Sequence, residues 1–454
     1  MSTVSRRSFL SRTALLAGGS LVGASLFERL SANTALAAQG RPGQRAGQRH
    51  GDYGPLIPST EVPDLALPAG FHARKFSEAG TLMSDGIPTP GSHDGMAAFA
   101  LPNGNIRLIR NHELTGGGPS TTFGNPASAY DPAAPGGTTS LEVRPDTREL
   151  VRSFGSLNGT VNNCAGGPTP WGSWLTCEEN TLGMSNGWPR NHGYIYEVPK
   201  SAEAFTPAVP IRAMGRFVHE AIAVDPQTGI VYETEDRNPS GFFRYIPTFP
   251  NNLAGGGRLE MLAIQGQAKY DTGTGQQVGR PLPVEWVPIA DPDPANTSSS
   301  NSQTVANQGF AQGAAQFARL EGAWFGGGSI SFTSTSGGTL GRGQVWEYAA
   351  HGNSGGQLRL LFESTDSTAL DNPDNITVTP RGGIILCEDG GADQFEFLRG
   401  LTPHGYIFDF AKNLVSGSEF AGATFSPDGQ TLFVNIQSPG ATYAIWGPWE
   451  NGAL

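Results

Sequence analysis

Residues 169–179 read TPWGSWLTCEE, and residues 379–389 repeat this stretch in outline as TPRGGIILCED. Each copy consists of a turn, an apolar run, and a cysteine that is followed by acidic residues. The tetrapeptide His-Gly-Tyr-Ile follows both copies, beginning at His192 and at His404. Two copies of one unit, about 210 residues apart, indicate repeated units arranged around a centre. We therefore expect the acidic ends of these strands to converge on a positively charged group.

Six segments of the chain share this design, in which a turn leads into an apolar strand that mostly finishes in polar or acidic residues. They cover residues 105–113, 173–179, 230–236, 329–335, 382–389 and 431–437. A second strand with an aromatic residue follows most of them, at residues 193–198, 241–246, 344–348, 405–410 and 441–446. The chain has 63 glycines, 34 prolines and only 15% charged residues, and it lacks a long amphipathic helical pattern. This composition favours many short strands joined by turns.

The sequence therefore predicts an all-β fold, namely a six-bladed β-propeller with long inserted loops. Six units in the chain average more than the roughly 40–45 residues of a common propeller blade, so some connections must be long. Residues 115–137 and 291–313 have the composition of such loops. A pair of β-sandwiches is the alternative, and the match between the second and fifth segments argues against it.

The N-terminal region has the three parts of an export signal. Residues 5–10 read SRRSFL, an apolar stretch runs from Ala14 to Leu26, and Ala35-Leu36-Ala37 offers a cleavage site. We predict a twin-arginine signal peptide at residues 1–37, a flexible leader at 38–55 and a single β-propeller domain at 56–454. The protein would then be carried by the twin-arginine translocase to the periplasm or the extracellular space. The apolar stretch is too short to leave a membrane span in the mature form.

Charge and cysteine content limit the partners. The chain carries a net charge of −11, and removal of the signal peptide would make it more negative. This sign argues against nucleic acid as a partner and suits hard cations. The three cysteines Cys164, Cys177 and Cys387 allow at most one disulfide, so at least one thiol is free or bound to a ligand. Nothing in the sequence indicates an oligomeric state.

A propeller brings strand ends that are distant in sequence to one axial channel, where acidic residues can gather around cations. Carboxylate and amide oxygens favour calcium or magnesium, and a thiolate among them favours iron. Arg319 lies two residues before Glu321, so both side chains share one face of a strand. Such an arginine can hold a phosphate through two hydrogen bonds, or it can simply pair with Glu321. The candidate acidic and amide groups are Asn111 to Glu113, Cys177 to Glu179, His219 and Glu220, Glu235 and Asp236, Glu321, Asp374 and Asn375, and Cys387 to Asp389.

These same residues make the chain similar to the PhoX family of exported alkaline phosphatases. The similarity runs through most of the chain after the signal peptide, and no single motif carries it alone. Its motifs are Arg110 to Glu113, Thr169 to Gly172 leading to Leu175 to Asn180, Arg216 to Glu220, Val231 to Asp236, Phe317 to Gly322, and Asp371 to Asn375.

The resemblance implies a six-bladed propeller that holds Fe3+, two ions in number, with two or three Ca2+ ions nearby. On this interpretation Cys177 is the thiolate ligand of iron, Glu235 and Glu321 are carboxylate ligands of the cluster, and Arg319 binds the substrate phosphate. These four would form the catalytic group. The resemblance implies further calcium ligands at Glu113, Glu178, Asp374, Asn375 and Glu388.

We therefore expect an exported metal-dependent phosphomonoesterase of the alkaline phosphatase type, acting on small phosphomonoesters through a ferric and calcium cluster in the central channel. Two other functions fit the same architecture. A calcium-dependent lactonase or esterase propeller would use converging acidic and amide residues but would need no thiolate. A non-catalytic periplasmic binding module would use calcium only to stabilise its fold.

Overall fold

The computed structural model describes residues 52–117, 121–295, 304–390 and 395–454. In this part of the chain strands predominate, and the one α-helix is α3 (Thr304–Ala311). Short 3-10 helices lie at Met184–Asn186, Arg212–Met214, Leu253–Gly255 and Trp449–Asn451. The predicted signal peptide and most of the predicted leader lie outside the described residues. No helix among the described residues is long and apolar enough to cross a membrane.

The strands pair in antiparallel order into five sheets. One sheet has the order β4 (His93–Ala100), β5 (Ile106–His112), β6 (Gly136–Val143), β7 (Leu150–Thr160). The next has β8 (Asn163–Pro168), β9 (Ser173–Glu178), β10 (Ile195–Pro199). The sheet that follows along the chain has nine strands, in the order β11 (His219–Val224), β12 (Val231–Glu235), β13 (Phe242–Pro247), β14 (Gly257–Ile264), β15 (Leu282–Pro288), β19 (Gly355–Glu363), β18 (Gln344–His351), β17 (Ser329–Ser334), β16 (Leu320–Gly326).

The last two sheets combine both ends of the described chain. One has the order β20 (Pro373–Val378), β21 (Ile384–Glu388), β22 (Phe397–Leu401), β23 (Ile407–Asn413), β2 (Leu65–Pro68), β1 (Leu56–Pro58). The other has β24 (Phe420–Phe425), β25 (Leu432–Ile436), β26 (Ala441–Trp446), β3 (His72–Phe76). N-terminal strands therefore complete sheets that the C-terminal residues begin.

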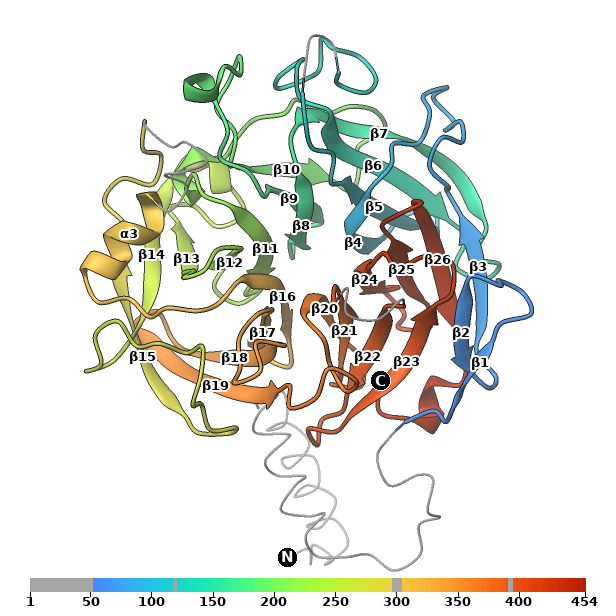
Figure 1. The fold of residues 1–454 in the computed structure, drawn as a ribbon. Helices are drawn as coiled ribbons and strands as arrows, with labels where there is room; N and C mark the ends of the chain where they lie inside the picture. Colours follow the sequence, from blue (N-terminus) through green and yellow to red (C-terminus); the bar gives the residue numbers. More distant parts are fainter. Residues whose placement is uncertain (1–51, 118–120, 296–303, 391–394) are drawn as a thin grey trace, which may run out of the picture.

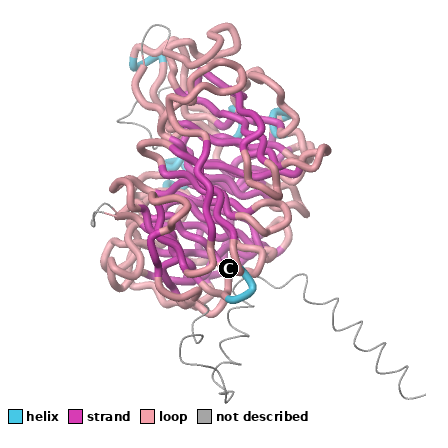
Figure 2. Tube along the Cα trace, turned by 90° about the vertical axis from the view of Figure 1, so that its right-hand side faces the viewer, coloured by secondary structure: helices cyan, strands magenta, loops and turns pink. Residues whose placement is uncertain are grey.

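The strands β4, β8, β11, β16, β20 and β24 form a closed ring at the centre of the molecule (Figure 1). Each of these inner strands contacts the next in this order, and β24 contacts β4 again. The remaining strands lie progressively further from the centre, and loops cover the outside of the strands in the side view (Figure 2). The all-β prediction is confirmed, and the arrangement is that of a β-propeller.

Small residues allow the inner strands to approach one another closely. A Cβ on Gly95 would lie 2.6 Å from Cα of Ala165, and one on Gly322 would lie 2.4 Å from the carbonyl oxygen of Asp374. The space on the axis between these strands is only about 20 Å³, and Met96, Trp174, Ala323 and Ile376 are among the residues that line it. The centre of the ring is therefore closed below the start of the inner strands.

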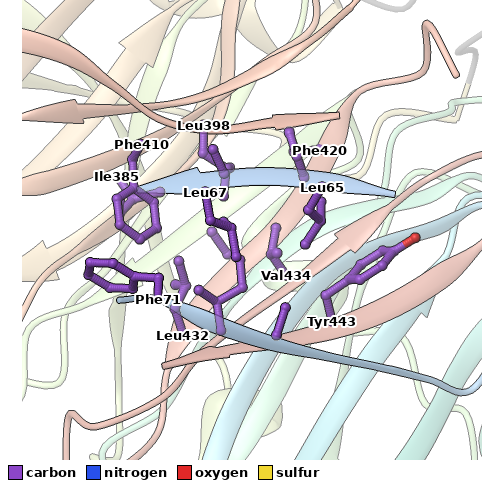
Figure 3. Close-up of a cluster of buried hydrophobic side chains, with 14 of the residues drawn as sticks. Leu65, Leu67, Phe71, Ile385, Leu398, Phe410, Phe420, Leu432, Val434 and Tyr443 are labelled. Carbon is purple, nitrogen blue, oxygen red and sulfur yellow. The ribbon is translucent and has the colours of Figure 1, made fainter. Parts of the chain in front are cut away.

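A large apolar cluster joins the two ends of the described chain (Figure 3). It packs Leu65, Leu67 and Phe71 from the N-terminal strands and the turn that joins β2 to β3 against side chains of the last two sheets, including Leu432 and Phe410. The β3–β26 ladder runs from His72 opposite Trp446 to Phe76 opposite Thr442. Closure of the ring therefore depends on burial of apolar area as well as on backbone hydrogen bonds.

The predicted apolar strands correspond to β5, β9, β12, β17, β21 and β25, which are the second strands from the centre. The sequence pattern did not predict the inner strands. Of the loop expected at residues 115–137, the described residues 115–117 and 121–135 lie in no helix or strand, and β6 begins at Gly136. The second expected loop, at residues 291–313, contains α3 instead. Its polar composition hides an apolar face, because Val305, Ala306 and Phe310 are buried in the cluster that includes Met261.

Removal of a buried side chain at the closure should destabilise the whole ring. Leu432 is fully buried in the cluster that joins the chain ends, so we expect Leu432→Ala to lower the free energy of unfolding by about 2–5 kcal/mol. The measurement is urea unfolding followed by fluorescence and circular dichroism. Leu340 is 55% exposed and gives the matched control, since Leu340→Ala should change stability little. Equal effects of the two substitutions would contradict this account of closure.

Candidate metal centre

A shared irregularity of the inner strands determines which side chains reach the centre. Each inner strand carries a register shift close to its start. A β-bulge of this kind bends the strand and redirects side chains. We call the second residues of the inner strands the first ring, and its members are Asp94, Cys164, Glu220, Glu321, Asp374 and Ala421.

Two further rings stand beside the first. The residues that directly follow the second strands form the second ring: Glu113, Glu179, Asp236, Thr335, Asp389 and Gln437. The residues that directly precede the inner strands form the rim ring: Ser92, Asn162, Val218, Arg319, Asn372 and Glu419. In every case the backbone N–H of the second-ring residue donates to the carbonyl of the rim-ring residue, over 2.8 to 3.2 Å. The same backbone geometry thus recurs around the whole ring.

Side chains of three second strands donate hydrogen bonds to the first-ring backbone of the next inner strand around the ring. Asn111 Nδ2 donates to the Cys164 carbonyl over 2.9 Å, and Thr234 Oγ1 donates to the Glu321 carbonyl over 2.6 Å. Asn435 Nδ2 donates in the same way to the Asp94 carbonyl over 2.7 Å. These bonds connect the backbone at three first-ring positions to the neighbouring sheet, so the positions of these ring residues do not depend on the loops alone.

The three rings gather acidic groups around Asp374. Oxygen or sulfur atoms of Cys164, Glu179 and Glu220 lie within 4.8 Å of one another. Atoms of Asp94, Glu113 and Glu419 form a second group of the same size. The charge of Asp374 raises the pKa of members of both groups and of Glu321, Asp389 and Cys387. The structure therefore places the carboxylates of all three rings in one cluster.

The cluster is electrostatically unfavourable when it holds only its own charges. Burial, followed by the charge of Asp374, raises the pKa of Glu113 to about 7 and that of Asp389 to about 7. Burial and neighbouring carboxylates also raise the pKa values of Asp94, Glu179, Glu220, Glu321 and Glu419. Buried carboxylates that oppose one another's ionisation are expected where a cation binds.

Arg319 provides a positive charge inside this cluster. Its Nε and Nη2 atoms donate to the two carboxylate oxygens of Asp236 over 2.9 and 3.0 Å, and Nη2 also donates to Glu321. Burial alone would lower the pKa of Arg319, but Glu321 and Asp236 more than reverse this effect and raise it. Its φ of 51° lies in the left-handed region, which is unusual for a residue with a side chain. The expected pairing with Glu321 is present, and Asp236 adds a second partner.

The thiol in the cluster belongs to Cys164. Its Sγ lies 3.4 Å from the carbonyl oxygen of His219. Burial, then Glu220 and Glu179, raises the pKa of this thiol. Cys177 lies on β9 opposite the bulge of β8, and among the described residues it belongs to neither group of possible metal ligands. Cys164 is therefore the cysteine that shares a group of possible metal ligands with carboxylates.

Among the residues expected from the sequence, the structure brings together Arg319, Glu321, Glu113 and Asp374. It places Cys177, Glu178, Glu235 and Glu388 outside the three rings. Side chains alternate between the two sides of a strand, so a residue directly before a second-ring position points away from the centre. Glu388 accepts a hydrogen bond from Arg399 Nε over 2.7 Å, and Glu235 accepts one from the Gly241 N–H over 3.0 Å. Burial raises the pKa of Glu235 to about 8.

Asn375 contacts the cluster through Asp374. Its Nδ2 donates to Asp374 Oδ1 over 2.8 Å, and its Oδ1 accepts the Gly422 N–H over 2.7 Å. Both ends of this amide are thus occupied within the protein. Asn375 orients the Asp374 carboxylate and links β20 to β24.

Asp94, Cys164 and Glu419 were not among the candidate groups expected from the sequence, whereas Glu179, Glu220, Asp236 and Asp389 were candidates without an assigned ligand role. A usable signal was present. The inner strands begin HDG, NCA, HEA, LEG, PDN and FAG, so that five of the six have an acid or thiol second and all have a small or amide residue third. Alignment of the repeats on this short pattern would have identified the first ring.

The fold and this centre define a class of protein, a β-propeller whose axis ends in a buried acidic cluster suited to cations. The family model described as alkaline phosphatase PhoX matches residues 51–440. The chain therefore belongs to the PhoX family of alkaline phosphatases, which are metal-dependent and hydrolyse phosphoric monoesters. No curated protein gave a significant sequence match.

One solved structure agrees with this fold. The chain is similar to Pseudomonas fluorescens PhoX in complex with vanadate, a transition state analogue, with a TM-score of 0.66 and 16% identity. That match covers 88% of this chain and 98% of the other. It is also similar to XC5397, a gluconolactonase from Xanthomonas campestris, with a TM-score of 0.43 and 12% identity over 87% and 98% of the two chains.

A buried ion pair holds the end of β9, from which Glu179 projects. His192 Nδ1 lies 2.6 Å from Glu178 Oε1, and His192 Nε2 lies 3.4 Å from Asp131 Oδ2. Glu178 also accepts the backbone N–H groups of Gly193 and Tyr194. Burial lowers the pKa of His192, but Glu178 and Asp131 outweigh burial and raise it to about 9. The imidazolium thus ties the loops before β6 and β10 to the strand end.

This ion pair predicts a pH dependence of stability. The pKa of His192 in the folded state, about 9, exceeds the ordinary histidine value of roughly 6.5. The charged ring should therefore contribute about 3 kcal/mol below pH 6.5, and this contribution should disappear as pH rises through 9. We expect denaturant unfolding of His192→Gln to differ strongly from wild type at pH 6 and much less at pH 10. His404→Gln, at the exposed equivalent position, should match wild type throughout, and a difference that grows with pH would contradict the prediction.

Proposed function

We propose that this protein is an exported phosphomonoesterase that uses a cluster of ferric and calcium ions at the centre of a six-bladed propeller. The observation that carries the proposal is the convergence of acidic side chains from three rings, with one thiol and one arginine, at one end of the axis. On this proposal the continuous nine-stranded sheet counts as two blades, β11 to β14 and β16 to β19, with β15 between them. The export signal predicted from residues 1–37 supports a periplasmic or extracellular location.

The donor atoms fit two kinds of metal ion. The group of Cys164, Glu179 and Glu220 contains a sulfur ligand and suits iron, whereas Asp94, Glu113 and Glu419 offer only oxygens and suit calcium. Asp374 and Glu321 lie among these groups and would complete the coordination. We therefore propose Cys164, rather than Cys177, as the thiolate ligand, with two ferric ions and two or three calcium ions in the centre. Bound metal ions would neutralise the charge of the substrate phosphate and polarise it.

Arg319 is suited to bind that phosphate. Asp236 and Glu321 hold its guanidinium in one orientation, and its side chain remains 37% exposed. Its Nη1 atom makes no hydrogen bond within the part of the chain that the structure describes. An arginine fixed beside the cluster can donate to the equatorial oxygens of the phosphoryl group as charge spreads in the transition state. The vanadate complex of the Pseudomonas fluorescens relative supports a phosphoryl-transfer site in this fold.

The calcium-dependent lactonase that the sequence left open would need no thiol at its centre. The sulfur of Cys164 lies within 4.8 Å of carboxylate oxygens of Glu179 and Glu220, and this mixed set of donors suits iron, whereas a site for calcium alone uses only oxygen ligands. This observation favours the phosphatase.

The two cysteines give a direct test of the metal centre. We expect Cys164→Ala to lose bound iron and to lower p-nitrophenyl phosphate hydrolysis by at least about 100-fold, since removal of a partner in the outer coordination sphere alone can cost 10–100-fold in affinity or activity. Cys177→Ala should retain metal and turnover, because Cys177 belongs to neither group of possible metal ligands among the described residues. Metal analysis of protein purified without chelator and turnover before and after calcium chelation are the measurements. Wild-type metal content in Cys164→Ala would contradict the assignment of Cys164 as the thiolate ligand of iron.

Arginine substitution tests phosphate binding separately from metal binding. We expect Arg319→Ala to lower kcat/KM by about 100-fold and to weaken inhibition by vanadate, while metal content stays near that of wild type. Arg319→Lys should recover little, because an ammonium group lacks the planar fork. Arg342 has a similar exposure of 38% and pairs with Asp371, so Arg342→Ala is the matched control. Turnover of Arg319→Ala within two-fold of wild type would contradict the assignment.

A further inference from the structure

Asn162 occupies the position of the rim ring that corresponds to Arg319. Its φ of 52° lies in the left-handed region, as do those of Arg319 and Asn372 at 51° and 48°. The Asn162 N–H donates to the Leu114 carbonyl, and its own carbonyl accepts the Glu179 N–H over 2.9 Å. The backbone therefore holds Asn162 firmly and directs its side chain toward the acidic cluster.

The neighbours of the Asn162 amide fix its orientation. Nδ2 lies 2.9 Å from Glu179 Oε2 and 3.3 Å from the Glu179 carbonyl oxygen. A carbonyl oxygen can only accept hydrogen bonds, so the amino group of Asn162 must face Glu179. Burial and the charge of Asp374 raise the pKa of Glu113, and hydrogen bonding with Glu179 and Asn162 lowers it by a smaller amount. Glu113 therefore lies close to the Asn162 side chain. The amide thus stands between Glu179 and Glu113.

The oxygen of the same amide has no partner. Asn162 is 6% exposed, and its Oδ1 is buried without a hydrogen bond in the part of the chain that the structure describes. A buried acceptor without a partner destabilises the folded protein. The side chains that the structure places beside this amide are the carboxyl groups of Glu179 and Glu113, and a cation held by these carboxylates would supply the partner that the oxygen lacks. Amide oxygens are common ligands of calcium.

We propose that Oδ1 of Asn162 is a ligand for a calcium ion that lies between Glu113 and Glu179, at the junction of the two groups of acidic residues. This inference rests on the proposed function, since it assigns a further ligand to the same centre. The amide would then serve two purposes, because its nitrogen orients Glu179 while its oxygen binds the ion.

Asn372 provides a control in the same structural position. It also belongs to the rim ring and has a similar φ. Its Nδ2 donates to the Thr335 carbonyl over 3.2 Å, and its Oδ1 accepts from Arg342 Nη1 over 3.4 Å. Both ends of this amide are used within the protein, so Asn372 has no free oxygen to offer an ion. Glycine is favourable at both positions, because both residues adopt a positive φ.

The experiment measures calcium bound per chain in the full-length metal-loaded protein, by equilibrium dialysis against buffers of defined free calcium. We expect Asn162→Gly to raise the free calcium needed for half-occupancy by about ten-fold for one ion. Asn372→Gly should leave calcium binding unchanged. Asn162→Asp should bind calcium at least as well as wild type, since it keeps a hard oxygen at this position and adds charge.

The order of the two Asn162 variants separates the ligand from a purely structural role. If the amide only donates to Glu179, then Asn162→Asp should bind calcium more weakly than Asn162→Gly, because it replaces a donor by a repelling carboxylate. Weaker calcium binding by Asn162→Asp than by Asn162→Gly would overturn the inference. Calcium binding of Asn162→Gly equal to that of wild type would overturn it as well. The proposed function would stand in both cases, provided that the wild-type protein binds calcium and hydrolyses phosphomonoesters. A wild-type protein that binds no calcium and hydrolyses no phosphomonoester would overturn the proposed function itself.

Discussion

The repulsion among buried carboxylates is the constraint on which the rest of the structure depends. Asp374 opposes ionisation of acidic groups from several strands, and an isolated chain would relieve this by moving them apart. The ring prevents such movement. Glycines such as Gly95 and Gly322 let the inner strands touch, and hydrogen bonds such as that from Thr234 to the Glu321 carbonyl join them. Burial of apolar area at the closure therefore stabilises a site that would otherwise be unfavourable without cations.

The sequence predicted the all-β fold and the second strands because those strands are apolar and end in recognisable acidic residues. It missed the inner strands, since residues such as Gly95 and Ala165 have low strand propensity and the bulges interrupt the two-residue period. The missed strands carry the first ring. In each adjacent acidic pair, Glu178 with Glu179 and Glu388 with Asp389, one side chain faces the centre and the other faces away. The strand register decides which one faces the centre, and composition and spacing do not specify this register.

The cysteines show the same difficulty. Cys177 and Cys387 lie at matching places in the repeat, and this symmetry made Cys177 the more conspicuous ligand. Both are opposite the bulge of an inner strand, at the place where Asn111 and Thr234 bond to the neighbouring strand. Repetition in sequence here marks positions that hold the inner strands together. Cys164 is the single thiol of the first ring, whose other members are acids or alanine. A site that selects a particular metal ion requires a ligand that the other repeats do not share, and Cys164 is such a residue.

Departures from symmetry also give the centre a direction. Around β16 and β17 the second ring has Thr335 in place of an acid, and the rim ring has Arg319. Around β24 and β25 the first ring has Ala421 and the second ring has Gln437. The acidic residue at this place is Glu419, which belongs to the rim ring. Negative charge is thus reduced beside Arg319 and retained at the rim beside Glu419. Since a phosphate is an anion, it meets the least repulsion on the Arg319 side, and cations meet the most attraction elsewhere in the cluster. Under the proposed function, one ring geometry altered at these five positions would hold metal ions and orient an anionic substrate above them.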